Sequence, residues 1–145
     1  MPSISDFMTD NHRHCDNMFA AAEQAANQEH WEEAKRATKE FLNEMELHFL
    51  MEENVLFPAL EEKTGMTMGP TQVMRLEHGQ MRELFEQMQQ ALDSKSKDDF
   101  LGASETLLIT MQQHNMKEEG IVYPMSDEQF SEKSADVLEQ MKRAS

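Results

Sequence analysis

One segment occurs twice in this chain, and this internal repeat constrains the fold more than any other feature. Residues 45–58 read MELHFLMEENVLFP, and residues 111–124 read MQQHNMKEEGIVYP, at a constant offset of 66. The same offset places HRHCDNMF, which begins at His12, over HGQMRELF, which begins at His78. We therefore expect two copies of one helical hairpin within a single domain that spans residues 1–145.

Apolar residues recur at spacings of three and four, which is the pattern of amphipathic helices. The pattern predicts an all-α protein with four long helices, over residues 5–27, 31–57, 70–92 and 99–123. Short connections predict an up-down-up-down antiparallel four-helix bundle. Pro58 is expected to break or kink the second helix and Pro124 to end the fourth, because proline has no amide hydrogen. Ser126 and Gln129 resemble a capping box, which predicts a short C-terminal helix to about Lys142.

Six side chains that can bind metal are expected to meet inside this bundle: His12, His48, Glu52, His78, His114 and Glu118. The two histidines of each hairpin are equidistant from its loop, so they lie at the same height. The second-helix glutamate and the third-helix histidine are likewise equidistant from Gly65, in the central connection. Each glutamate follows a histidine by four residues, so both side chains lie on one face of their helix. That face is also the apolar one, which predicts burial.

Two carboxylates on apolar helix faces indicate a bound cation, because an unpaired buried carboxylate is strongly disfavoured. Imidazole with carboxylate favours iron, manganese or zinc over magnesium or calcium, and the lack of thiolate ligands argues against a structural zinc site. Two glutamates shared by four histidines fit a binuclear centre in which each glutamate bridges both ions. We expect His12 and His48 to bind one ion and His78 and His114 to bind the other, with positions left open for an external ligand.

The order His, His-x-x-x-Glu, His, His-x-x-x-Glu resembles the hemerythrin-like, or HHE cation-binding, domain over about residues 6–124. The resemblance implies two iron ions joined by an oxo or hydroxo bridge, with manganese or zinc less expected. The chain departs from the oxygen-carrying hemerythrins at two places. Met74 stands where they have a fifth histidine, and Glu118 stands four residues after its histidine, where they have an aspartate at five. The near-symmetric ligand set is closer to the HHE proteins and to the di-iron proteins that repair iron–sulfur clusters.

The resemblance implies that the protein binds O₂, or another diatomic molecule such as NO, as a binder or sensor. The alternative is a di-iron redox enzyme that reduces peroxide or O₂, or that acts in nitrosative or iron–sulfur stress repair. Iron storage is less expected, since one bundle offers two ions and no evident cage surface. A sensor would also need a protein partner, for which the sequence gives no candidate.

The net charge of −15 comes from 28 acidic and 13 basic side chains, and it excludes some classes of partner. Such a field repels nucleic acid and anionic membrane surfaces, so neither is an expected partner. The sequence contains no recognisable signal peptide, and no apolar run is near the ~20 residues of a membrane span. The single cysteine, Cys15, rules out an internal disulfide and favours the reducing cytoplasm.

Several side chains close to the expected site receive a structural interpretation. Cys15 lies one turn from His12 and is expected to fill the core. Tyr123 and its repeat partner Phe57 are expected to wall the site by packing, with proton donation by the phenol as the alternative. Glu53 and Glu119 are expected near the surface or beside the site, where one of them could orient a ligand histidine.

Overall fold

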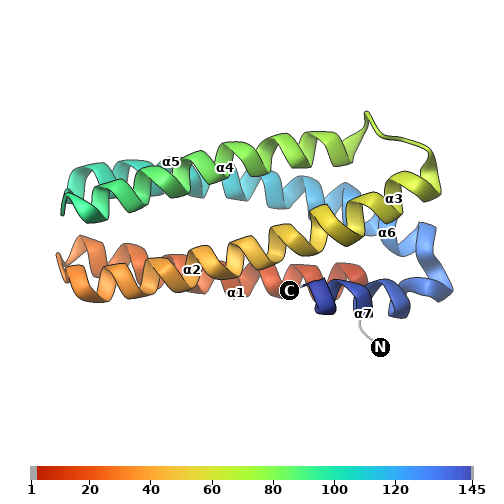
Figure 1. The fold of residues 1–145 in the computed structure, drawn as a ribbon, viewed down its shortest axis with the longest axis horizontal. Helices are drawn as coiled ribbons and strands as arrows, with labels where there is room; N and C mark the ends of the chain where they lie inside the picture. The colour runs from red at the N-terminus through yellow and green to blue at the C-terminus, as the bar shows by residue number, and fades with distance from the viewer. Residues whose placement is uncertain (1–2, 145) are drawn as a thin grey trace.

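The computed structural model describes residues 3–144, and within them it contains helices and no strand. Four long helices lie along the long axis of the molecule (Figure 1): α1 (Ile4–Asn27), α2 (Trp31–Met51), α4 (Pro70–Asp93) and α5 (Lys97–Lys117). Three shorter helices are α3 (Phe57–Thr64), α6 (Tyr123–Phe130) and α7 (Ser134–Ala144). The prediction of an all-α fold with four long helices and a short C-terminal helix is confirmed.

Each long helix packs against two others. α1 contacts α2 and α5, and α4 contacts α5 and α2. The connections at residues 28–30 and 94–96 lie at one end of the molecule, and the connection at residues 65–69 lies at the other (Figure 1). None of the helices formed by residues 3–144 is both long and apolar enough to span a membrane.

The two hairpin turns share one backbone conformation at matched positions. Glu29 and Lys95, which the offset of 66 matches, both adopt the left-handed conformation, with φ of 57° and 51°. Ser96 then caps α5, and its side chain accepts a hydrogen bond from the Asp99 amide, as expected of a helix N-cap. At the other end of the molecule Gly65, with φ of 74°, ends α3 in the conformation that glycine adopts most readily.

A π-helical turn precedes each of the two prolines. Glu52–Leu56 and Glu118–Val122 form these turns, and the amides of Phe57 and Tyr123 donate to the carbonyls five residues before them. Each proline therefore falls in the first turn of the following α-helix, where no amide hydrogen is required. At Pro58 the expected interruption takes this form, but the prediction that Pro124 ends its helix is wrong, since α6 continues beyond it.

The predicted capping box at Ser126 and Gln129 is also wrong. Ser126 is buried inside α6, and its hydroxyl donates to the carbonyl of Val122 at 2.8 Å, as serine does in the middle of a helix. A 3₁₀ turn at Ser131–Lys133 follows, and α7 begins at Ser134. Because the helix passes through Pro124, the C-terminal helix starts eight residues later than the sequence pattern suggests.

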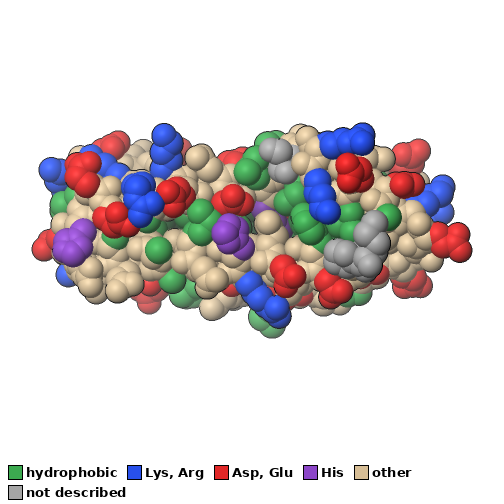
Figure 2. All heavy atoms as spheres, turned by 90° about the horizontal axis from the view of Figure 1, so that it is seen from below, with side chains coloured by type: hydrophobic (Ala, Val, Ile, Leu, Met, Phe, Trp, Pro, Cys, Tyr) green, Lys and Arg blue, Asp and Glu red, His purple; other side chains and the backbone are tan. Residues whose placement is uncertain are grey.

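The interior holds two apolar clusters. The larger cluster fills the end of the bundle next to the hairpin turns and includes Phe19, Phe41, Phe49, Phe85 and Phe100. The smaller cluster fills the other end, where α7 packs on the bundle, and includes Met8, Leu56, Phe57, Met74 and Met141. Charged side chains lie on the outside, and on the face drawn in Figure 2 acidic and basic groups are interspersed along the whole molecule. Between the two clusters lies a polar layer.

Candidate metal centre

The polar layer contains all six predicted ligands. Each of the six is at most 5% exposed. Each long helix carries one of the histidines: His12, His48, His78 and His114 lie on α1, α2, α4 and α5 in turn. Glu52 and Glu118 are the first residues of the two π-helical turns. The structure therefore brings together every residue that the repeat selects.

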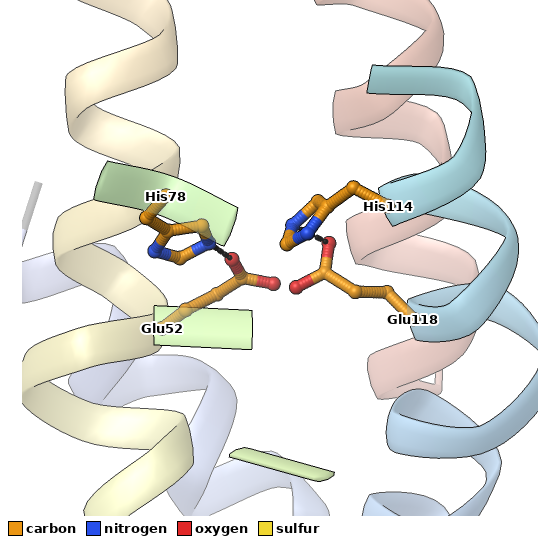
Figure 3. A group of neighbouring side chains, drawn as sticks. All are labelled: Glu52, His78, His114 and Glu118. Atoms are coloured by element: carbon orange, nitrogen blue, oxygen red, sulfur yellow. Dashed lines mark ion pairs between the residues drawn. The ribbon is translucent and has the colours of Figure 1, made fainter. Parts of the chain in front are cut away.

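Four of these residues form one compact group, which we call the His78 set: Glu52, His78, His114 and Glu118. One ligand atom from each lies within 4.8 Å of the others. Nε2 of His78 is 3.0 Å from Oε1 of Glu52, and Nε2 of His114 is 3.2 Å from Oε1 of Glu118. Figure 3 shows the two carboxylates extending toward each other from opposite helices, with both imidazoles beside them.

A second group, which we call the His12 set, consists of His12, His48 and Glu118. Oε1 of Glu118 is 3.0 Å from Nε2 of His12 and 3.9 Å from Nε2 of His48. Glu118 therefore belongs to both sets. Glu52 also reaches toward the His12 set, because its Oε2 is 3.5 Å from Nε2 of His48.

The nitrogen and oxygen atoms of the His78 set are better placed to bind a cation than to form hydrogen bonds with one another. Apart from the ion-pair contacts within the set, four of them are buried without a hydrogen-bond partner in the described residues: Oε1 of Glu52, Nε2 of His78, Nε2 of His114 and Oε2 of Glu118. Each such atom costs about 1–3 kcal/mol unless something else pairs with it. No lysine or arginine of residues 3–144 forms an ion pair with either glutamate. Imidazole nitrogens and carboxylate oxygens are suitable ligands for iron, manganese or zinc.

The other ring nitrogen of each of the four histidines at the site is held by a polar side chain. Nδ1 of His12 lies 2.7 Å from Glu119 and Nδ1 of His78 lies 2.6 Å from Glu53. Since a carboxylate can only accept, each Nδ1 carries a proton, and Nε2 is the nitrogen that would bind a metal. The sequence suggested that one of these two glutamates orients a histidine, and in the structure both do.

Two further partners of this kind were missed at the sequence level. Nδ1 of His48 donates to Oδ1 of Asn11 at 2.6 Å, and Nδ1 of His114 donates to Glu77 at 2.8 Å. Asn11 and Glu77 are matched by the 66-residue offset, and each directly precedes a histidine of the repeat. That shared position is the signal that could have identified them.

Tyr123 does more than pack against the site. Its hydroxyl is buried among the ligands, 2.6 Å from Oε2 of Glu52 and 2.9 Å from Oε1 of Glu118. It also lies 3.1 Å from Nε2 of His12 and 3.3 Å from Nε2 of His48. Burial, followed by the charges of the two glutamates, raises the pKa of Tyr123 well above its usual value, so the phenol keeps its proton.

Phe57 and Cys15 match their expected packing roles more closely. The Phe57 ring lies 5.8 Å from the His78 ring and carries no polar atom, although it is the repeat partner of Tyr123. Cys15 is buried in the larger cluster. Burial, assisted by Glu44 and Asp16, raises the pKa of the Cys15 thiol to about 12, so it remains protonated.

The buried histidines make the stability of metal-stripped protein depend on pH. Burial alone would lower the pKa of His48, but Glu52 and Glu118 outweigh it and raise the value to about 10. His114 follows the same pattern, and Glu118 raises its pKa to about 9. For Glu53, burial is outweighed by hydrogen bonds from His78 and Arg82, which lower its pKa to about 2.

Metal-stripped protein is expected to be most stable between pH 4.5 and 6.5. The two histidines contribute fully below 6.5, their unfolded value, and this contribution is lost as the pH rises toward about 10. Glu53 contributes above 4.5, and its contribution is lost as the pH falls toward about 2. Urea unfolding in a chelating buffer at several pH values measures this profile. A free energy of unfolding that is unchanged between pH 6.5 and 10 would contradict the assignment.

Comparison with known proteins places this geometry in a family. The family model described as the hemerythrin HHE cation binding domain matches residues 3–126, which include all six ligand candidates and Tyr123. Neither the curated proteins nor the solved structures gave a match. α7 lies outside the matched residues.

Proposed function

Because the chain belongs to the family of hemerythrin HHE cation-binding domains, we propose that it is a non-haem di-iron protein that binds O₂ or another diatomic molecule such as NO, as a binder or sensor. Membership of this family implies metal binding, and the cluster of histidines and glutamates fits a metal site. We assign two iron ions to it, with His12, His48, Glu52, His78, His114 and Glu118 as ligands. Manganese or zinc would suit the same atoms but is the weaker assignment.

The observation that carries the proposal is the convergence of four unpartnered donor atoms in one buried place. Bound iron would supply a redox-active centre that can take up a small molecule. The chain supplies the rest: imidazoles and carboxylates bind, the partners of each Nδ1 fix the rings, and the two apolar clusters exclude water.

The second candidate is a redox enzyme that acts on peroxide, O₂ or reactive nitrogen species, and the position of Tyr123 favours it. The phenol holds a proton 2.6 Å from Oε2 of Glu52, inside the site. A proton source in this place suits the reduction of a small oxidant, which consumes protons together with electrons.

The proposal extends to the architecture of the whole chain. We propose one domain, an up-down-up-down bundle made from two copies of a helical hairpin. The paired π-helical turns and the paired left-handed residues at the same offset of 66 support this interpretation. A cytoplasmic location, a protein partner for a sensor and the absence of nucleic-acid or membrane partners stay predictions from the sequence.

Metal analysis with optical spectroscopy tests the function. Protein purified without added metal is expected to contain two irons per chain and to show near-ultraviolet absorption that bleaches on reduction. After exposure of the reduced protein to air, a stable new visible band supports ligand binding, whereas an immediate return to the oxidised spectrum supports the enzyme.

The ligand assignment has its own control in this experiment. His48→Ala and Glu118→Ala are expected to lower the metal content, since each removes a donor from the buried layer. A content of one ion or none that neither substitution changes would contradict the proposed centre.

A further inference from the structure

The two halves of the site differ in how their polar atoms are satisfied, although the repeat makes their ligands equivalent. The four site atoms without a hydrogen-bond partner in the described residues include both Nε2 atoms of the His78 set and neither Nε2 atom of the His12 set. In the His12 set, by contrast, Nε2 of His12 and Nε2 of His48 both have a polar neighbour in the Tyr123 hydroxyl. The Tyr123 hydroxyl therefore contacts both imidazoles of the His12 set, and within residues 3–144 it forms no hydrogen bond with His78 or His114.

This difference arises at one pair of positions that the repeat matches, where the two hairpins carry different residues. Tyr123 has a hydroxyl where its partner Phe57 has none. The phenol has one proton, which it can donate to Oε2 of Glu52 or to Oε1 of Glu118. An ion bound by His12 and His48 has to displace the hydroxyl from both imidazole nitrogens, whereas in the His78 set the hydroxyl contacts only the carboxylates.

The groups that orient the histidines differ in the same direction. In the His78 set, His78 is oriented by Glu53, which Arg82 holds with hydrogen bonds of 2.9 and 3.1 Å. His114 is oriented by Glu77, which Lys117 holds in turn. Each of these histidines therefore has a charged partner that is itself anchored by a cation.

The histidines of the His12 set have weaker support. The partner of His48 is Asn11, a neutral amide in place of a carboxylate. The partner of His12 is Glu119, whose side chain is 40% exposed and whose ion pair within residues 3–144 is with His12 alone. A carboxylate partner makes imidazole a more basic ligand than an amide partner does, and loss of such a partner typically weakens metal binding about 10- to 100-fold.

We propose that the two sets hold their ions with unequal strength: the His78 set retains its ion, and the His12 set exchanges its ion readily with the solution. This inference rests on the proposed di-iron function and adds to it an assignment of which ion leaves. Tyr123 and Asn11 act as the residues that weaken the His12 set, the first by competing for donor atoms and the second by providing a neutral partner.

Metal release measures the inequality directly and does not depend on any activity. Full-length protein loaded with Fe²⁺ under anaerobic conditions is mixed with an excess of a coloured ferrous chelator, and the coloured complex is followed over time. We expect two phases, each of one ion per chain, with the first at least about tenfold faster than the second. Dialysis against a weaker chelator is expected to leave one ion per chain.

Matched substitutions assign the two phases to the two sets. Tyr123→Phe and Asn11→Glu are each expected to slow the fast phase and to leave the slow phase unchanged. Glu77→Asn, which gives the His78 set the amide that the His12 set has naturally, is expected to accelerate the slow phase alone. Circular dichroism of each variant verifies that the helices are intact.

Two results would overturn the inference and leave the proposed centre in place. One is release of both ions in a single phase from the unmodified protein. The other is two phases that neither Tyr123→Phe nor Asn11→Glu alters. A protein that binds fewer than two irons before the chelator is added would instead contradict the proposed function, and the inference with it.

Discussion

Glu118→Gln is expected to remove both ions from the protein, the largest effect of any single substitution at the site. Glu118 is the only residue shared by the His12 and His78 sets, and its Oε1 lies 3.0 Å from Nε2 of His12 and 3.2 Å from Nε2 of His114. Glutamine keeps the size of the side chain but loses the negative charge, so a buried dication would lack half of its carboxylate compensation. We expect affinity for the first ion to fall by at least about 100-fold, measured by equilibrium titration with Fe²⁺.

A surface glutamate on the same helix provides the matched control. Glu105 is exposed on α5, and Glu105→Gln makes the same chemical change away from the site. It is expected to leave both the metal content and the affinity unchanged. If Glu118→Gln bound two irons with the affinity of the unmodified protein, Glu118 could not be a ligand.

Phe41→Ala is expected to lower the free energy of unfolding of the metal-stripped protein by about 3–5 kcal/mol. Phe41 is fully buried in the larger cluster, where its ring packs edge-on against Phe19 and Phe85 at centroid distances of 5.4 and 5.9 Å. Alanine would lose these contacts and leave a cavity that the surrounding helices cannot fully close. Urea unfolding followed by circular dichroism measures the loss.

Ile109→Ala serves as the comparison for this substitution. Ile109 is 52% exposed on α5, and its truncation is expected to change the free energy of unfolding by no more than about 0.5 kcal/mol. A loss at Phe41 as small as that at Ile109 would mean that the larger cluster contributes little to stability. The two variants together therefore test where the folding energy of the bundle lies.

The six candidate ligands could be predicted from the sequence because their positions follow from loop midpoints and helix periodicity alone. Tyr123 was expected beside the site in a packing role, and its hydrogen bonds to the carboxylates could not be predicted in this way, because five residues after Glu118 is a different face of a regular α-helix. The π-helical turn that begins at Glu118 widens the backbone and brings the phenol within 2.9 Å of that carboxylate. Periodicity assumes a regular helix, so it fails where the helix changes its pitch.

The sequence pattern also did not reveal which side chains form hydrogen bonds between helices. Asn11 lies next to His12 in the chain, but its Oδ1 accepts a hydrogen bond from Nδ1 of His48 on another helix. This contact depends on how α1 and α2 are rotated against each other. The same limit explains the error at Pro124. Proline cannot donate the backbone hydrogen bond of a regular α-helix. The sequence does not reveal that a π-helical turn before Pro124 lets the helix continue without that bond.

The position of the polar layer between two apolar clusters affects how a small molecule would reach it from the solvent. With every candidate ligand at most 5% exposed, an incoming molecule would have to pass between packed side chains. The smaller cluster contains Met8, Met74 and Met141, whose unbranched side chains change rotamer easily. A neutral diatomic gas could pass through transient gaps between these side chains. Nitrite or superoxide would first have to lose the water that hydrates its charge. Under the proposed function, the apolar clusters would therefore select neutral gases over ions before either reached the six candidate ligands, at a rate set by side-chain motions in the clusters.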